Sequence, residues 1–355
     1  MRPEDLGYNK ELEDFRNKQG LNSFDAARVI AEHKERYIVK NEKHEYEAEI
    51  TGNLRNTASS RSDFPAVGDW VAISVFNESN AIIHKIFPRT TILERQAVGK
   101  YGDKQIIATN IDYAFITQSV DRDFNINRLE RYLTLCYSAR ITPIIVLSKT
   151  DLINQTEKKD ILAEVKDRIK SVPVVAVSSI ITDGYEELLS LIEKGKTYCF
   201  LGSSGVGKST IINTIAGKDY MKTNSISKST KKGKHTTSHR ELIVLETSGI
   251  LIDNPGMREV GITDSDSGIE NTFDNIISLS VKCRFRDCTH MHEDGCAVLE
   301  AVENGELDRA SYENYLKMER ERSHFQLSLI EKREKDRKFG KMVKNIMKKK
   351  KENEE

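Results

Sequence analysis

The chain has 355 residues, 31% of them charged and 38% hydrophobic, a balance typical of a soluble protein of about two or three domains. Basic and acidic residues both number 55, which excludes a uniformly basic nucleic-acid-binding chain but not a local basic patch. No apolar run approaches the ~18 residues of a membrane span, and the polar start excludes a secretory signal. Five cysteines, three of them clustered with a histidine, favour a reducing compartment and a metal site over disulfides. We therefore expect a cytoplasmic protein without a membrane partner.

The N-terminal part predicts a helical extension followed by a small β-barrel. Within residues 1–35, one helix is expected to end at Gly20 and a second to start at Ser23, because apolar residues recur at helical spacing. Residues 36–98 contain the short runs RYIV, YEAEI, DWVAISV and AIIHKI, separated by polar turns. This pattern predicts a five-stranded barrel of the oligonucleotide-binding (OB) type, although a barrel without a ligand has the same pattern.

Strands alternate with helices over residues 99–265, which predicts a three-layer α/β domain with buried parallel strands. Residues 266–330 are expected to form a helical module around a cysteine/histidine cluster, and the charged residues 331–355 to be disordered. The expected strands cover 111–120, 142–149, 172–179, 197–204, 241–247 and 249–256, and the expected helices 125–140, 155–170, 184–195 and 208–217.

A phosphate-binding loop is predicted at 202–209, where GSSGVGKS fits G-x-x-x-x-G-K-[ST] between a strand and an apolar helix start. Glycines let backbone N–H groups turn toward phosphate oxygens, and the helix N-terminus adds partial positive charge. Lys208 would reach the β- and γ-phosphates, and the Ser209 hydroxyl would bind Mg²⁺. The nucleotide-binding residues expected here are Gly202, Ser203, Ser204, Gly205, Val206, Gly207, Lys208, Ser209 and Thr210.

The segment Ser148, Lys149, Thr150 and Asp151 follows an apolar strand and resembles the guanine-reading N-K-x-D motif of GTPases. A carboxylate at Asp151 can accept hydrogen bonds from N1–H and the 2-amine of guanine, whereas adenine offers no such donor pair. Serine stands where asparagine is usual, and its hydroxyl cannot reproduce both faces of an amide. We therefore expect selectivity to rest mainly on Asp151. Ser178, after the next strand, resembles the fifth GTPase motif, whose backbone contacts the base.

The order of the motifs predicts a circular permutation. In an ordinary GTPase the phosphate loop precedes the base motif, but here the base motif at 148 comes first and D-N-P-G follows at 253–256. Asp253 ends a strand, where a carboxylate can hold the Mg²⁺ shell through water, and the Gly256 amide can contact a γ-phosphate.

A basic segment over 221–240 without acidic residues is interpreted as the first switch. Thr236 or Thr237 should complete the Mg²⁺ shell, and the sequence leaves open which of them does. Met257 stands where many GTPases carry a water-orienting glutamine, and methionine cannot hydrogen-bond the attacking water. We therefore expect slow intrinsic hydrolysis, with His235 as the candidate catalytic residue; alternatively, a partner supplies the missing group.

Three cysteines and a histidine lie within fourteen residues of one another, at Cys283, Cys288, His290 and Cys296. Closed Cys3His sets suit one structural Zn²⁺ and leave no open position for catalysis. The cluster is surrounded by basic and aromatic residues, namely Arg284, Phe285, Arg286 and the basic tail. Such residues can bind RNA through charge and stacking, or they can simply face solvent.

Together these motifs resemble the ribosome small-subunit-dependent GTPase A family over about residues 33–320. The resemblance includes PAVGDWV at 65–71 and KGKHTT in the basic segment. It implies an OB-fold domain, a circularly permuted GTPase domain and a zinc-binding domain. It also implies that the protein binds the small ribosomal subunit and its rRNA late in maturation and hydrolyses GTP to GDP with stimulation by the subunit. His235 matches a switch histidine that is implicated in hydrolysis in some members.

We expect the protein to be a monomer. Two alternative functions remain open at this point. A kinase with the same phosphate loop would need an acceptor pocket, but Asp151 and the permuted order speak against it. A nucleotide-binding RNA scaffold with little or no turnover is the second alternative, to which Ser148 and Met257 lend weight.

Overall fold

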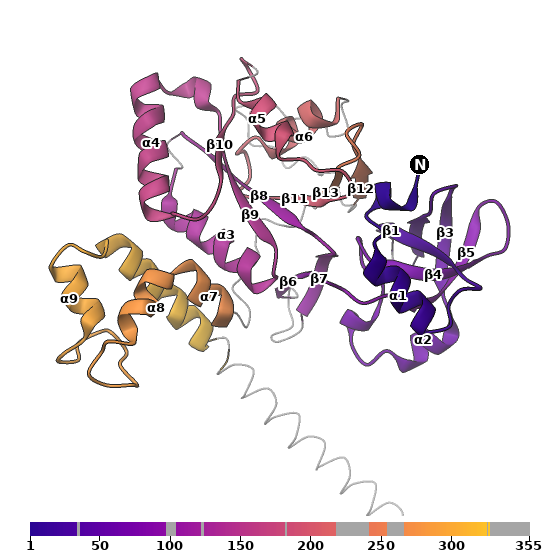
Figure 1. The fold of residues 1–355 in the computed structure, drawn as a ribbon, viewed down its shortest axis with the longest axis horizontal. Coiled ribbons are helices and arrows are strands. Elements are labelled where there is room, and N and C mark those ends of the chain that lie inside the picture. The colour runs from indigo at the N-terminus through magenta and orange to yellow at the C-terminus, as the bar shows by residue number, and fades with distance from the viewer. Residues whose placement is uncertain are drawn as a thin grey trace, which may run out of the picture.

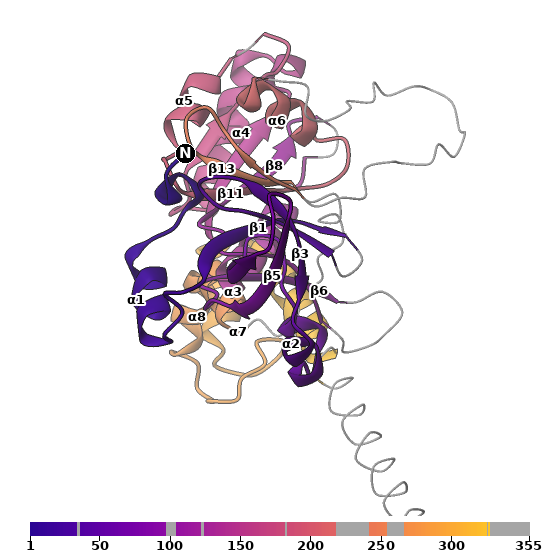
Figure 2. The ribbon, with the colours of Figure 1, turned by 90° about the vertical axis from the view of Figure 1, so that its right-hand side faces the viewer.

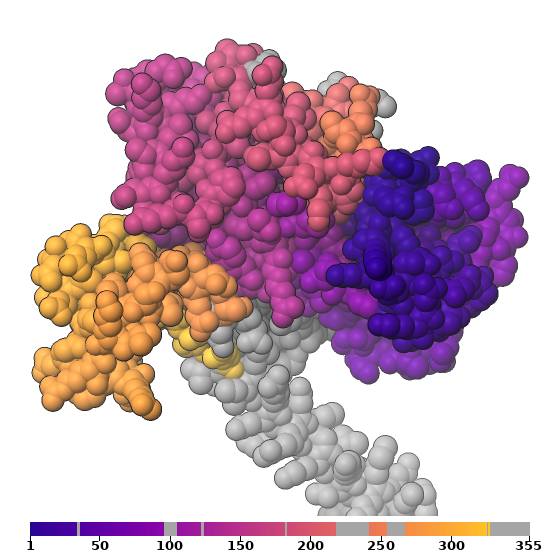
Figure 3. Space-filling view, in the orientation of Figure 1, coloured from indigo at the N-terminus to yellow at the C-terminus, as the bar shows by residue number. Residues whose placement is uncertain are grey.

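The structure, a computed structural model, describes residues 1–33, 36–96, 104–121, 124–181, 183–217, 241–253, 266–324 and 326. A β-barrel, an α/β domain and a helical module follow one another along the chain (Figure 1). The barrel and the helical module lie at opposite ends of the α/β domain (Figures 1 and 3). In the described part of the chain, no helix is long and apolar enough to cross a membrane.

The barrel closes because its first strand pairs with two neighbours. The strand order is β1-β2-β3-β5-β4, with β4 pairing back to β1 and β3 running parallel to β5. This closed five-stranded arrangement confirms the predicted barrel. Its interior is filled by side chains such as Val29, Val39, Val71 and Ile83, all of them buried. The elements are α1 (Lys10–Lys18), β1 (Asp25–His33), β2 (Arg36–Lys40), β3 (Glu45–Ile50), α2 (Gly52–Thr57), β4 (Trp70–Val75) and β5 (Asn80–Ile86).

The prediction of a helix from Ser23 is wrong, because residues Asp25–His33 form β1, the first strand of the barrel. Five consecutive residues of β1, 27–31, are buried, since one face lines the barrel and the other lies against the rest of the chain. A strand that is buried on both faces is a continuous apolar run, and such a run also satisfies the spacing of a helix. Periodicity alone therefore cannot distinguish a strand from a helix in this segment. The first helix, α1, is present and ends just before Gly20, as predicted.

The α/β domain is built on a sheet of order β10-β9-β8-β11-β13-β12, in which only β12 is antiparallel to its neighbour. Alternate residues of β9 serve opposite faces: Ile145 and Leu147 join the core under α3 and α4, and Ile144 and Val146 the core under α5 and α6. This arrangement confirms the predicted three layers. The elements are β8 (Tyr113–Ser119), α3 (Ile126–Ser138), β9 (Thr142–Ser148), α4 (Gln155–Arg168), β10 (Val174–Ala176), α5 (Tyr185–Ser190), β11 (Thr197–Leu201), α6 (Lys208–Ala216), β12 (Glu241–Val244) and β13 (Ile250–Asp253).

The barrel and the α/β domain share one continuous sheet. Ala31 of β1 pairs with Glu241 of β12, which joins the two into eleven strands. Figure 2 views the molecule from the barrel side, with the barrel in front of the α/β domain. A separate hairpin, β6 (Ile92–Gln96) and β7 (Lys104–Thr109), links the two parts and was not among the expected strands.

The helical module packs on α3 through α7 (Asp266–Thr272). The Oγ1 atoms of Thr134 in α3 and Thr272 in α7 are 3.0 Å apart and hydrogen-bonded. A small core around Phe273, Ile276 and Val298 holds the module together. Its other elements are α8 (Asp274–Ser280), α9 (Ala297–Glu303) and a helix over 309–324.

Candidate functional site

The carboxyl ends of the parallel strands meet at one edge of the sheet, the place where ligands bind in open α/β folds. Strand register places them there: Ile252 of β13 lies opposite Cys199 of β11, and Leu147 of β9 lies opposite Gln118 of β8. The loops at this edge bring together the phosphate loop after β11, the base motif after β9, Ser178 after β10, and Asp253 at the end of β13.

Gly202 starts the phosphate loop at a point where no side chain fits. Its φ is +145°, and a Cβ there would lie 2.2 Å from the carbonyl oxygen of Thr117 in the neighbouring strand β8. The loop therefore leaves the sheet in direct backbone contact with β8. It then enters α6 through Gly207, whose φ of +93° also suits glycine. Backbone N–H groups at the start of such a helix are available to an anion.

Lys208, the first residue of α6, lies over the loop that it follows. Its Nζ donates to the carbonyl oxygens of Gly202, at 2.8 Å, and Ser203, at 2.6 Å. The ammonium group is thus held within the loop, where it can act on phosphate oxygens. Ser204 and Thr210 are exposed, and Ser209 is half-buried beside Lys208.

The base motif is oriented by two contacts at its ends. Asp151 accepts a hydrogen bond from the Ser178 hydroxyl at 2.5 Å, and Ser178 is fully buried. Lys149, with φ of +59°, forms an ion pair with Asp121 after β8, with an Nζ to Oδ2 distance of 2.9 Å. Asp121 was not singled out from the sequence, although its position just after a buried strand is the same signal that marked the base motif. Thr150, between them, is buried.

Ser148 connects the base motif to the phosphate loop. It is 2% exposed, and its Oγ donates to the carbonyl oxygen of Val206 at 2.6 Å. The hydroxyl therefore fixes the end of β9 against the turn before α6, so that the base motif and the phosphate loop are held together.

Of the remaining residues expected to bind the nucleotide, the structure describes only Asp253. Asp253 is half-buried at the end of β13. His235, Thr236, Thr237 and Gly256 lie outside the described residues.

The expected metal ligands come together in the helical module. The ligand atoms of Cys283, Cys288, His290 and Cys296 all lie within 4.8 Å of one another. Cys283 Sγ is 3.9 Å from Cys296 Sγ, and His290 Nδ1 is 3.6 Å and 3.4 Å from those two sulfurs. Zinc bond lengths in a tetrahedron give separations of about 3.8 Å between sulfurs and about 3.6 Å between sulfur and nitrogen. The Cys3His set therefore fits a tetrahedral metal ion.

The loop that carries His290 is held by neighbours outside the cluster. The Glu293 carboxylate accepts the amide of Thr289 at 2.9 Å and that of Met291 at 3.0 Å, and the Tyr312 hydroxyl donates to the His290 carbonyl at 2.6 Å. The hydroxyl and amide of Thr289 hold the pKa of Glu293 well below its usual range. Burial lowers the pKa of His290, which favours the neutral imidazole that binds metals.

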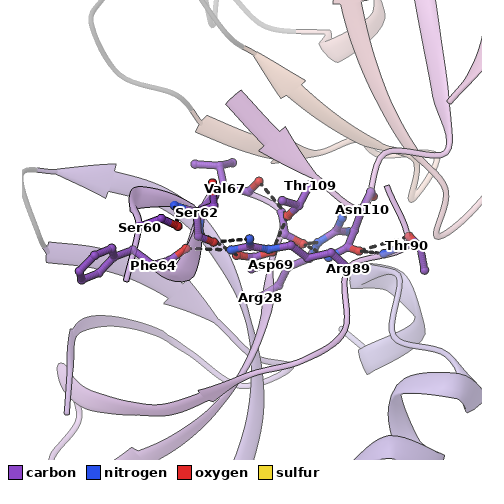
Figure 4. A network of polar contacts seen from close by, with 12 residues as sticks. Arg28, Ser60, Ser62, Phe64, Val67, Asp69, Arg89, Thr90, Thr109 and Asn110 are labelled. Atoms are coloured by element: carbon purple, nitrogen blue, oxygen red, sulfur yellow. Dashed lines mark hydrogen bonds and ion pairs between the residues drawn. The ribbon is translucent and has the colours of Figure 1, made fainter. Parts of the chain in front are cut away.

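A buried polar network joins the barrel to the α/β domain (Figure 4). Asp69, fully buried, accepts from Arg89 Nε at 2.9 Å and Nη2 at 2.7 Å, and from the Thr109 hydroxyl at 2.7 Å. Beside it, Arg28 is 1% exposed and donates to the Thr197 hydroxyl at the start of β11, at 2.9 Å. Burial lowers the pKa of Arg28 to about 10. In the sequence, Asp69 only opens one of the expected barrel strands and belongs to the PAVGDWV segment, and neither feature indicates its buried ion pair with Arg89.

A second buried carboxylate joins the α/β domain to the helical module. Glu130 of α3 is 2% exposed and accepts from Arg168 Nε and Nη2, both at 2.7 Å. From the module, Ser311 and Asn314 donate to the same carboxylate. The two outer parts are therefore each fixed to the α/β domain by a buried charge.

A phosphate loop that follows the base motif on a doubly covered parallel sheet, between a closed barrel and a Cys3His module, defines a circularly permuted P-loop GTPase. The RsgA GTPase family model matches residues 86–263, and a model described as 50S ribosome-binding GTPase matches residues 197–344. The second match begins at β11, so the base motif lies outside it, as a permuted order requires.

Relatives and solved structures agree with this class. The chain is 41% identical to small ribosomal subunit biogenesis GTPase RsgA 1 of Bacteroides thetaiotaomicron, over 95% of this chain and 94% of the relative. It is 44% identical to small ribosomal subunit biogenesis GTPase RsgA 2 of Lactiplantibacillus plantarum, over 84% of this chain and 83% of the relative. YjeQ from Thermotoga maritima superposes with a TM-score of 0.63 at 25% identity, over 86% and 98%. YloQ, described as a circularly permuted GTPase, superposes with a TM-score of 0.61 at 26% identity, over 84% of this chain and 94% of YloQ. The chain belongs to the RsgA GTPase family.

Proposed function

We propose that this protein binds the small ribosomal subunit late in its maturation and hydrolyses GTP to GDP and phosphate with stimulation by the subunit. The observation that carries the proposal is the junction of base motif and phosphate loop at one sheet edge in an RsgA-family chain. Relatives that match most of its length are named small ribosomal subunit biogenesis GTPases. We further propose that it acts as a cytoplasmic monomer.

Guanine would be read by Asp151, which the Ser178 hydroxyl holds in position. The aliphatic stem of Lys149 would pack over the base plane while its ammonium group stays paired with Asp121. The amides of residues 202–209 and Lys208 would bind the phosphates. Ser209 and Asp253 would hold Mg²⁺ directly and through water, and bound Mg²⁺ supplies positive charge to the β- and γ-phosphate oxygens.

In hydrolysis, a water molecule attacks the γ-phosphorus, and the bond from that phosphorus to the bridging oxygen of GDP breaks. Met257 has no group to orient this water, so we propose His235 for that role. Thr236 or Thr237 would complete the Mg²⁺ shell, and the Gly256 amide would contact the γ-phosphate. We propose that the bound subunit completes this catalytic set, so the free protein should hydrolyse GTP slowly.

The Cys3His cluster would hold one structural Zn²⁺, since its four ligands leave no open position. Beside it, Phe285 is 46% exposed and the Arg284 guanidinium lies 5.4 Å from its ring centre. A cation next to an exposed aromatic ring offers phosphate pairing and base stacking together, so we propose that this face of the module contacts rRNA.

The test is GTP and ATP hydrolysis by the purified protein, alone and with added small or large ribosomal subunits. Stimulation of GTP turnover by the small subunit alone is the expected result. Nucleotide binding without turnover, even with subunits, would replace this proposal by a non-hydrolysing RNA scaffold, which the methionine at 257 would explain. The Asp151→Asn variant should lose the preference for GTP over ATP, and unchanged selectivity would remove the base assignment.

A further inference from the structure

The hydroxyl of Ser148 is committed to the protein's own backbone. The oxygen of Val206 is a carbonyl and can only accept, so the 2.6 Å bond between them uses the proton of Ser148. A serine hydroxyl carries one proton, and after this bond it can only accept. Ser148 is also 2% exposed, so its oxygen is packed inside the protein beneath the turn before α6.

The two edges of guanine need different partners. Its Watson–Crick edge carries the N1–H and 2-amine donors, which a carboxylate such as Asp151 can accept. The opposite edge offers only the acceptors N7 and O6, so a protein group that reads N7 must donate a proton. An asparagine amide has two N–H donors, enough for one bond to a loop carbonyl and one to N7. Ser148 has only one, and that donor is already used.

We infer that this chain recognises guanine without a hydrogen bond from residue 148 to N7, so that base selectivity falls on the Watson–Crick edge through Asp151. The inference rests on the proposed guanine site and refines it. The geometry supports a division of tasks: Ser178 aligns Asp151 through a 2.5 Å bond, and Ser148 holds the base motif to the phosphate loop. Ser148 is thus a positioning residue, and its identity sets which edge of the base is read.

The experiment measures dissociation constants of GDP, 7-deaza-GDP, IDP and ADP by calorimetry, for the full chain and its Ser148→Asn variant. In 7-deaza-GDP a C–H group replaces N7, and in IDP the 2-amine is absent. The unaltered protein should bind 7-deaza-GDP within about twofold of GDP and bind IDP about tenfold or more weakly, as expected for loss of a hydrogen bond to a carboxylate. The Ser148→Asn variant should gain about two- to tenfold preference for GDP over 7-deaza-GDP.

Each outcome decides a separate point. A loss of more than about fivefold on 7-deaza-GDP in the unaltered protein would overturn the inference, because a donor to N7 would then exist at this site. Equal binding of GDP and ADP would instead overturn the proposed guanine site. The Ser148→Thr variant keeps a hydroxyl and should retain equal binding of GDP and 7-deaza-GDP. A new preference for GDP in Ser148→Thr would contradict the role given to the single proton.

Discussion

Replacing Asp69 by asparagine would remove one buried charge where the barrel meets the β6–β7 hairpin and leave the side chain the same size. The carboxylate is fully buried and accepts four hydrogen bonds, from two nitrogens of Arg89, the Thr109 hydroxyl and the Ala66 amide. Each oxygen accepts two of these bonds. An amide has only one oxygen, so in either orientation its N–H2 group would face two donors.

The expected cost follows from this geometry. Two buried hydrogen bonds are lost, at least one of them to a charged group, and the Arg89 guanidinium remains only 13% exposed without a carboxylate. Bonds to charged groups contribute about 1.5–3 kcal/mol each, and an uncompensated buried charge costs about 3–5 kcal/mol. We therefore expect Asp69→Asn to lower the free energy of unfolding of the barrel by about 3–5 kcal/mol.

Fluorescence of the single tryptophan measures this directly in a urea titration. Trp70 follows Asp69 in the chain, is 2% exposed and has its ring centre 4.9 Å from that of Tyr8. With a urea slope of about 1.5 kcal/mol per molar for a unit of this size, the midpoint should fall by about 2–3 M.

Glu49→Gln is the matched control, because it also neutralises a barrel carboxylate paired with an arginine. Glu49 lies 3.7 Å from Arg36, but the two side chains are 65% and 68% exposed, so the change should cost less than about 1 kcal/mol. A urea midpoint for Asp69→Asn no lower than that for Glu49→Gln would refute the reasoning. Burial would then make no difference to how much a charged carboxylate contributes to the free energy of unfolding.

Three further predictions concern the other parts of the chain. Glu130→Gln should lower the free energy of unfolding of the helical module by about 3 kcal/mol, because a buried carboxylate loses its charge beside an arginine, and hydrogen exchange of helix 309–324 should accelerate. His290→Ala should lower zinc content measured by mass spectrometry, whereas His292→Ala, an exposed residue outside the cluster, should retain it. Gly202→Ala should weaken GDP binding at least tenfold because its Cβ would meet the Thr117 carbonyl. At Gly217, where φ is also positive but nothing lies within 4 Å, the same change should leave affinity nearly unaltered. Equal effects at the two glycines would show that steric contact is not the cause.

The local motifs could be found from sequence because each is short and its chemistry is carried by adjacent residues. The phosphate loop, the base motif and the cysteine/histidine spacing all depend on a few residues that a strand, turn or helix start places automatically. The strands and helices of the α/β domain were predicted closely for a related reason: their apolar runs are long enough to separate strand from helix.

Features that depend on distant parts of the chain were missed. The strand β1 is buried on both faces only because β4 and β12 flank it, and neither neighbour is visible in the sequence of 25–33 itself. Asp69 and Arg89 resemble ordinary surface charges until the fold encloses them. The proton of Ser148 could be assigned only once Val206, 58 residues away, was seen beside it.

The contact between Arg28 and Thr197 also has a consequence for biosynthesis, because 169 residues separate them. All strand pairs that close the barrel lie within residues 25–86, so the barrel can form as soon as that segment has left the ribosome that makes it. Synthesis proceeds at about 5–20 residues per second, so Thr197 on β11 is made on the order of ten to thirty seconds after Arg28. During that interval its guanidinium lacks one of its acceptors. Until β11, the strand before the phosphate loop, has been synthesised, the barrel lacks this hydrogen bond to the α/β domain.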